Sequence, residues 1–105
     1  MSVRGKKLGV LLSTRPEHPG FDHGLRLAEA ALAEGVDVYL YCIDEAVLGV
    51  TDARLQRLQA AGLKLFGCAY AARRRNLPMT DQVTFAGLTM VSELIAGTDR
   101  FVSFN

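Results

Sequence analysis

The chain has 105 residues, of which half are hydrophobic and 22% are charged. This length and composition are those of one globular domain with a substantial core, and they rule out a second domain. The formal net charge is +1, from 12 basic and 11 acidic side chains, which excludes the broad basic surface of a protein that binds nucleic acid or an acidic membrane. No apolar run reaches membrane-spanning length, and the two cysteines lack the spacing of a disulfide framework. We therefore expect a soluble cytoplasmic protein.

The first third of the chain predicts a strand, a loop and a helix. Residues 8–12 form a short continuous apolar run, typical of a strand buried on both faces. Residues 13–20 contain two prolines and a glycine, which indicate a loop. Hydrophobic residues then recur at helical spacing, and Gly35 is placed to end that helix; they are Phe21, Leu25, Ala28 and Leu32.

The rest of the chain continues the alternation of strands and helices. Residues 36–43 predict a second strand, and Thr51 or Asp52 can cap a helix that ends at Gly62. A third strand is expected at 64–67, followed by Cys68. The remaining expectations are a helix at 69–75 stopped by 76–78, a brief strand or extended loop at 83–85, a helical stripe from Leu88 to Ile95, and an edge strand at 101–104.

This alternation predicts one three-layer α/β domain over residues 1–105, with a mainly parallel sheet and helices on both faces. We expect a flavodoxin-like strand order, with the first strand between the second and the third. Cys42 and Cys68 would then lie two strand spacings apart, about 9–10 Å. A disulfide needs Cα atoms within about 7 Å, so these cysteines are not expected to pair.

Cys68 is the candidate catalytic residue, because it stands where a strand gives way to a helix at the carboxyl edge of the sheet, where ligands gather in such folds. Unpaired N–H groups at a helix start favour the thiolate, the nucleophilic form of cysteine. The alternative is that Cys68 is a small buried hydrophobe, as many free cysteines are.

Four further side chains are candidates for a rim that attracts an anionic substrate. Arg73 and Arg74 follow Cys68 on the predicted helix, and His18 and His23 flank the first loop on the same edge of the sheet. A solvated helix end and solvated loop histidines are the structural alternatives.

Other chemistries find less support in the sequence. Cys68 and Arg74 have the C-x5-R spacing of cysteine-dependent phosphatases, but the residues between them are helix formers without a glycine. The chain has no glycine-rich nucleotide motif, no C-x-x-C pair and no histidine spacing typical of a metal site. We expect no metal and no cofactor.

The order of these features resembles that of the DsrE/DsrF-like sulfur-relay family, which includes the TusBCD proteins of tRNA thiolation and the DsrEFH proteins of sulfur oxidation. The resemblance spans residues 8–104. It rests on Ala33-Glu34-Gly35-Val36-Asp37-Val38 before the second strand, on the cysteine-helix motif at 68–74, and on the closing segments at 86–88, 93–94 and 99–104. Asn76 stands where a glycine commonly ends the helix of the motif, but asparagine tolerates the left-handed conformation.

The resemblance implies an intracellular persulfide carrier with sulfurtransferase-like chemistry, in which Cys68 accepts sulfane sulfur from one protein and hands it to another. It also implies a homo-oligomer, a trimer or hexamer rather than a dimer, that needs no cofactor, no direct nucleic-acid contact and no membrane. The alternative from another functional class is a non-catalytic oligomeric interaction module with an incidental cysteine.

Overall fold

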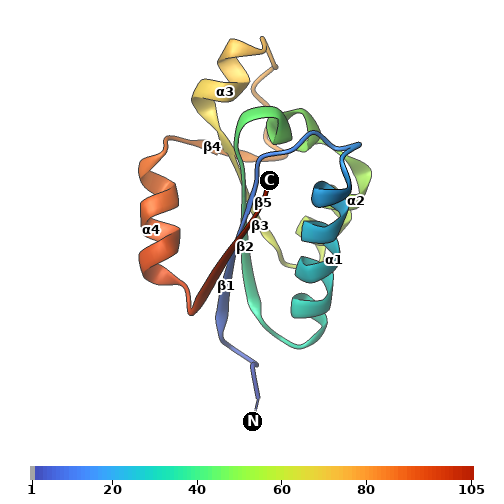
Figure 1. The fold of residues 1–105 in the computed structure, drawn as a ribbon, viewed down its shortest axis with the longest axis vertical. Helices are drawn as coiled ribbons and strands as arrows, with labels where there is room; N and C mark the ends of the chain where they lie inside the picture. Colours follow the sequence, from blue (N-terminus) through green and yellow to red (C-terminus); the bar gives the residue numbers. More distant parts are fainter. Residues whose placement is uncertain (1) are drawn as a thin grey trace.

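Five parallel strands form one sheet in the order β4-β3-β2-β1-β5 in the computed structural model, which describes residues 2–105 (Figure 1). The strands are β1 (Lys7–Leu12), β2 (Asp37–Cys42), β3 (Lys64–Cys68), β4 (Thr84–Ala86) and β5 (Arg100–Phe104). All four neighbouring pairs are parallel. The predicted α/β class, the parallel sheet and the closing edge strand are confirmed, and the ambiguous segment at 83–85 contributes the short strand β4.

The position of β1 in the sheet differs from our expectation. We expected β1 between β2 and β3, whereas it lies between β2 and β5, and β2 is the neighbour of β3. The chain therefore steps across the sheet in one direction from β1 to β4 and returns once, from β4 to β5. A strand buried on both faces is apolar whichever strands flank it, so the hydrophobic pattern carries little information about order.

The helices lie on both faces of the sheet, as predicted. Figure 1 shows α1 (Pro19–Ala33) and α2 (Ala53–Ala60) on one face and α4 (Thr89–Gly97) on the other. Right-handed crossovers explain this, because the connections from β1 to β2 and from β2 to β3 run one way across the sheet and the return to β5 runs the opposite way. The short α3 (Ala69–Arg74) and the 3-10 helix η1 (Asp44–Gly49) sit at the carboxyl ends of β3 and β2.

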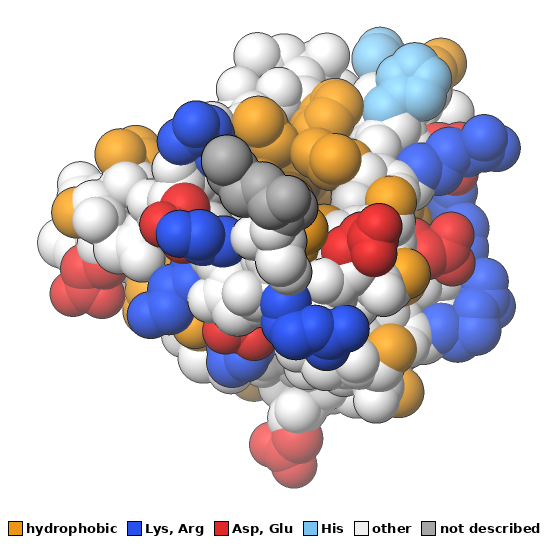
Figure 2. Space-filling view, turned by 90° about the horizontal axis from the view of Figure 1, so that it is seen from below, with side chains coloured by type: hydrophobic (Ala, Val, Ile, Leu, Met, Phe, Trp, Pro, Cys, Tyr) orange, Lys and Arg blue, Asp and Glu red, His pale blue; other side chains and the backbone are white. Residues whose placement is uncertain are grey.

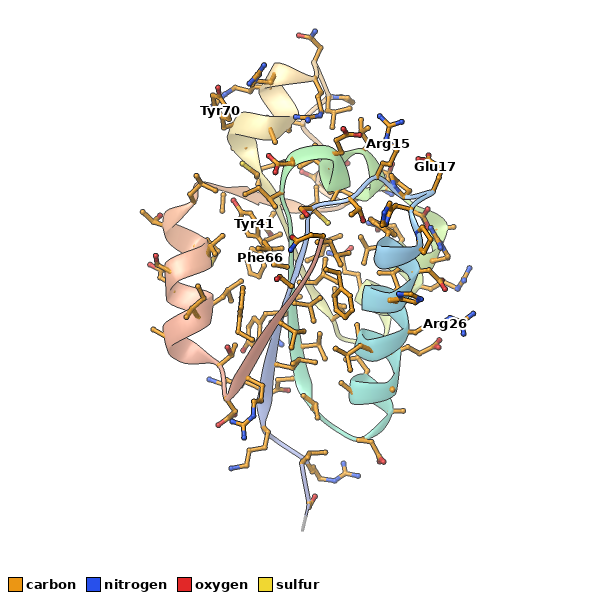
Figure 3. The ribbon with its side chains drawn as sticks, viewed as in Figure 1. Arg15, Glu17, Arg26, Tyr41, Phe66 and Tyr70 are labelled. Carbon is orange, nitrogen blue, oxygen red and sulfur yellow. The ribbon has the colours of Figure 1, made fainter. Side chains whose placement is uncertain are left out.

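The two faces of the sheet are covered unequally. On the side of α1 and α2 the central strands contribute fully buried residues, including Val10, Leu40 and Leu65, which share one level of the ladder. The other side is covered by α4 alone, which packs against β1 and β5. Tyr39 on β2 and Phe66 on β3 therefore remain partly exposed on this side, and Figure 3 shows where Phe66 lies.

Left-handed residues end three of the helices, as the sequence predicted. Gly35 and Gly62 follow α1 and α2 with φ of 81° and 117°, and Asn76 follows α3 with φ of 54°. The amide of Asn76 donates to Arg73 O at 3.1 Å and the amide of Leu77 donates to Ala72 O at 3.0 Å. This pair of bonds is the Schellman arrangement, so asparagine performs the role that glycine usually has at this position.

The surface agrees with the near-neutral net charge. Figure 2, which looks onto the amino-terminal ends of the strands, shows acidic and basic side chains interspersed on that face. Within residues 2–105, no helix has both the length and the hydropathy needed to cross a membrane.

Candidate functional site

Cys68 is the last residue of β3 and the N-cap of α3, which confirms its predicted place in the fold. Its backbone is extended (φ −71°, ψ 115°), and its Sγ accepts a hydrogen bond from the amide of Ala71 at 3.4 Å. A serine or aspartate oxygen usually makes this contact, and here sulfur takes its place.

Cys68 is nonetheless only 2% exposed, and its surroundings include a residue that sequence reasoning missed. Tyr41 on β2 is fully buried, and its hydroxyl lies within donating distance of Ala86 O (3.0 Å) and Gly87 O (3.2 Å). The sulfur of Cys68 lies near this hydroxyl. Burial, and secondarily the sulfur, raise the pKa of Tyr41 far above its ordinary value.

The only signal for Tyr41 in the sequence is a side chain with a polar hydroxyl close to the end of a largely apolar strand. Its contact with Cys68 depends on β2 and β3 being neighbours, which is the part of the strand order that the sequence did not predict. Figure 3 shows Tyr41 and Phe66 on the side of the sheet that α4 covers.

Cys42 occupies a different environment from Cys68. It pairs with Gly67 in the ladder between β2 and β3, so the two cysteines are on adjacent strands and the expected separation of two strand spacings was wrong. Side chains alternate along a strand, so Cys42 points toward α1 and α2 whereas Cys68 points to the face of Tyr41. Opposite faces keep the sulfurs apart, and both cysteines are free. Complete burial raises the pKa of Cys42 to about 12.

The structure does not gather the four predicted rim residues into one group. His18 is the N-cap of α1, with its Nδ1 accepting from the amide of Gly20 at 2.9 Å, and His23 is exposed on the same helix. Arg73 and Arg74 are exposed at the end of α3, and the Arg74 guanidinium lies 5.8 Å from the ring centroid of Tyr70. Their role as an anion rim stays a prediction.

One hollow of about 530 Å³ lies at the carboxyl edge of the sheet and contains only His18 of those four residues. Its lining is Ser13, Thr14, Arg15, His18, Asp44, Glu45 and Arg75. Arg75 therefore reaches this edge of the sheet, whereas Arg73 and Arg74 do not line the hollow. Arg15 pairs with Glu45 at 2.6 Å, so part of the positive charge in the hollow is already neutralised.

The arrangement around Cys68 does not match a phosphatase loop. Residues 69–74 form the helix α3, and the amide of Ala71 donates to the Cys68 sulfur, so this segment is not a loop whose amides surround an anion. The guanidinium of Arg74 lies over Tyr70, which points away on the outer side of α3 (Figure 3). Among residues 2–105 no group of three or more His, Cys, Asp or Glu side chains is placed to hold a metal ion.

Comparisons with known proteins agree with this geometry. The crystal structure of the ychN protein from E. coli superposes with a TM-score of 0.79 at 18% sequence identity, covering 94% of this chain and 99% of that one. At this identity the likeness shows a shared fold. No curated protein matches the chain in sequence. The model of the DsrE/DsrF-like family matches residues 6–104, nearly the whole chain, and the protein therefore belongs to the DsrE/DsrF-like family.

Proposed function

We propose that this protein is a sulfur-relay protein in which Cys68 accepts sulfane sulfur as a persulfide and passes it on. The observation that carries the proposal is the position of Cys68 in a DsrE/DsrF-like chain, at the carboxyl end of β3 with the Ala71 amide donating to its sulfur. Sulfur transfer requires a nucleophilic thiolate and no metal or nucleotide, which fits the residues around Cys68. A reducing cytoplasm would keep both cysteines free for this chemistry.

The transfer step follows ordinary persulfide chemistry. The Cys68 thiolate attacks the terminal sulfur of a donor persulfide, a new S–S bond forms at Cys68, and the donor cysteine leaves as a thiolate. The reverse step, with an acceptor thiolate attacking the terminal sulfur on Cys68, releases the sulfur to the next protein. No external oxidant or reductant is consumed in either step.

We further propose that the protein works as a homo-oligomer, a trimer or hexamer rather than a dimer. Support comes from the side of the sheet covered by α4 alone, where Ile95 on α4 is 54% exposed, Leu88 before α4 is 56% exposed and Phe66 on β3 is partly exposed. Burying such residues against another copy would remove apolar surface from water. Light scattering should give three or six times the monomer mass at micromolar concentration, and a monomer or dimer mass would refute this part of the proposal.

A second candidate is a non-catalytic interaction module, and the burial of Cys68 favours it. A sulfur that is 2% exposed has the surroundings of a structural cysteine. In this alternative the family fold supplies an assembly surface, and the cysteine fills space at the start of α3.

Intact-mass spectrometry separates the two candidates. The protein is incubated with a cysteine desulfurase and cysteine, or with thiosulfate, and then freed of donor. The relay proposal predicts an added sulfur on the wild type and on Cys42→Ala, and none on Cys68→Ser. Uptake that persists in Cys68→Ser but is lost in Cys42→Ala would move the site to Cys42, and no uptake by any variant from either donor would favour the module.

A further inference from the structure

In the arrangement that the structure shows, Cys68 is buried and lies next to the chain that leaves β4. Ala86, the last residue of β4, is the ladder partner of Cys68, and Gly87 and Leu88 lead directly into α4. We call residues 86–88 the β4–α4 connection. For a sulfur donor to reach Cys68, part of the protein around this sulfur has to move.

The β4–α4 connection is held in place by few contacts. The strand before it has three residues, and the helix after it begins without a side-chain cap and buries only Leu94. Gly87 and Leu88 are exposed. Backbone with so little buried surface opens at a lower free-energy cost than the core does.

The Tyr41 hydroxyl joins this connection to the core of the sheet. Tyr41 lies on the central strand β2 with no exposed surface, and its hydroxyl reaches Ala86 O at 3.0 Å and Gly87 O at 3.2 Å. We propose that the Tyr41 hydroxyl is a latch that holds the β4–α4 connection closed beside Cys68, and that release of this latch gives access to the sulfur. The role of release in giving a donor access to Cys68 rests on the proposed sulfur-relay function, whereas the holding of the connection by Tyr41 does not.

The position of Cys68 makes release less costly than breaking an ordinary buried hydrogen bond. A buried hydroxyl that loses its acceptors is left unsatisfied, which is the main cost of breaking such a bond. The Cys68 sulfur lies near the Tyr41 hydroxyl. When Ala86 O and Gly87 O move away, the Tyr41 hydroxyl can donate to the Cys68 sulfur instead. The sulfur then gains a donor while it becomes accessible.

Tyr41→Phe tests the latch, and Tyr39→Phe is its matched control. Tyr39 lies two residues earlier on the same strand and the same face, and its hydroxyl makes no hydrogen bond within residues 2–105. Two rates are measured at neutral pH in each protein: alkylation of Cys68 by iodoacetamide, located by peptide mass, and hydrogen exchange of the Met90 and Val91 amides, which donate to Gly87 O and Leu88 O.

Tyr41→Phe should raise both rates about tenfold, the factor that corresponds to one net hydrogen bond, while Tyr39→Phe changes neither. Unchanged rates in a folded Tyr41→Phe protein would overturn the proposal. Equal increases in both variants would overturn it as well, since they would reflect general loosening of this face.

A test on the wild-type chain covers the case in which Tyr41→Phe fails to fold. Methyl methanethiosulfonate places a small methylthio group on Cys68, for which the closed site has no room. Exchange of Met90 and Val91 should then rise, and a rise confined to α3 would show that access opens elsewhere. None of these readouts requires sulfane sulfur, so failure of the latch and failure of the sulfur-relay function are distinguishable.

Discussion

Replacing Cys42 with alanine should remove a specific part of the alkaline loss of stability. Complete burial raises the pKa of Cys42 from 9.0 to about 12. Above pH 9 the unfolded chain ionises this thiol and the folded chain does not, so rising pH favours unfolding. The stability that the neutral thiol contributes is complete below pH 9 and is lost progressively up to about pH 12. Between pH 8 and pH 10 the loss is roughly 1 kcal/mol, since one pKa unit corresponds to about 1.36 kcal/mol.

Urea unfolding of the wild type and of Cys42→Ala at both pH values measures this difference. The alanine variant is less stable at each pH because it leaves a cavity, but that cost cancels when the two pH values are subtracted. The wild type should lose roughly 1 kcal/mol more than Cys42→Ala between pH 8 and pH 10. The other ionisable side chains are present in both proteins, so the comparison isolates the effect of removing the Cys42 thiol. The same pH dependence in wild type and variant would refute the burial argument for Cys42.

Two further predictions concern positions where the backbone conformation or the side-chain packing determines whether a substitution stabilises or destabilises the protein. Asn76→Gly should stabilise the protein by up to about 1 kcal/mol and Asn76→Val should destabilise it by about 1–2 kcal/mol, because φ is 54° at this residue. Urea unfolding measures both changes. Gly24→Ala should destabilise by about 1–3 kcal/mol although alanine favours helices, because the added Cβ would overlap the buried side chain of Leu12. Gly97→Ala, which meets no atom within 4 Å, should show no such loss in the same assay.

The local features of the fold were predictable from the sequence because each depends on short stretches of chain. Gly35 and Gly62 marked the ends of their helices, and both adopt the left-handed conformation that only glycine takes without strain. The change from an apolar run to helix formers located Cys68 at the end of β3 and the start of α3.

Features that depend on how distant segments meet were not predictable in the same way. The order of the strands depends on where the connections from β2 to β3 and from β4 to β5 carry the chain across the sheet, and this leaves no mark on the hydrophobic pattern of β1 or β2. The error in order concealed the neighbourhood of Tyr41 and Cys68. It also gave the wrong separation for Cys42 and Cys68. They lie on adjacent strands, and their side chains are kept apart because they point to opposite faces of the sheet.

The central claim is that Cys68 both accepts sulfur and hands it on, and transfer between two copies of the chain tests it most directly. Wild-type protein labelled with nitrogen-15 is loaded with sulfur, separated from the donor and mixed with unloaded, unlabelled Cys42→Ala protein, so that intact-mass spectrometry distinguishes the two chains with and without an added sulfur. The relay account predicts that sulfur appears on Cys42→Ala and decreases on the wild type, and that a Cys42→Ala, Cys68→Ser acceptor receives none. Sulfur that never leaves the wild type, or that reaches the acceptor lacking Cys68 equally well, would contradict the account.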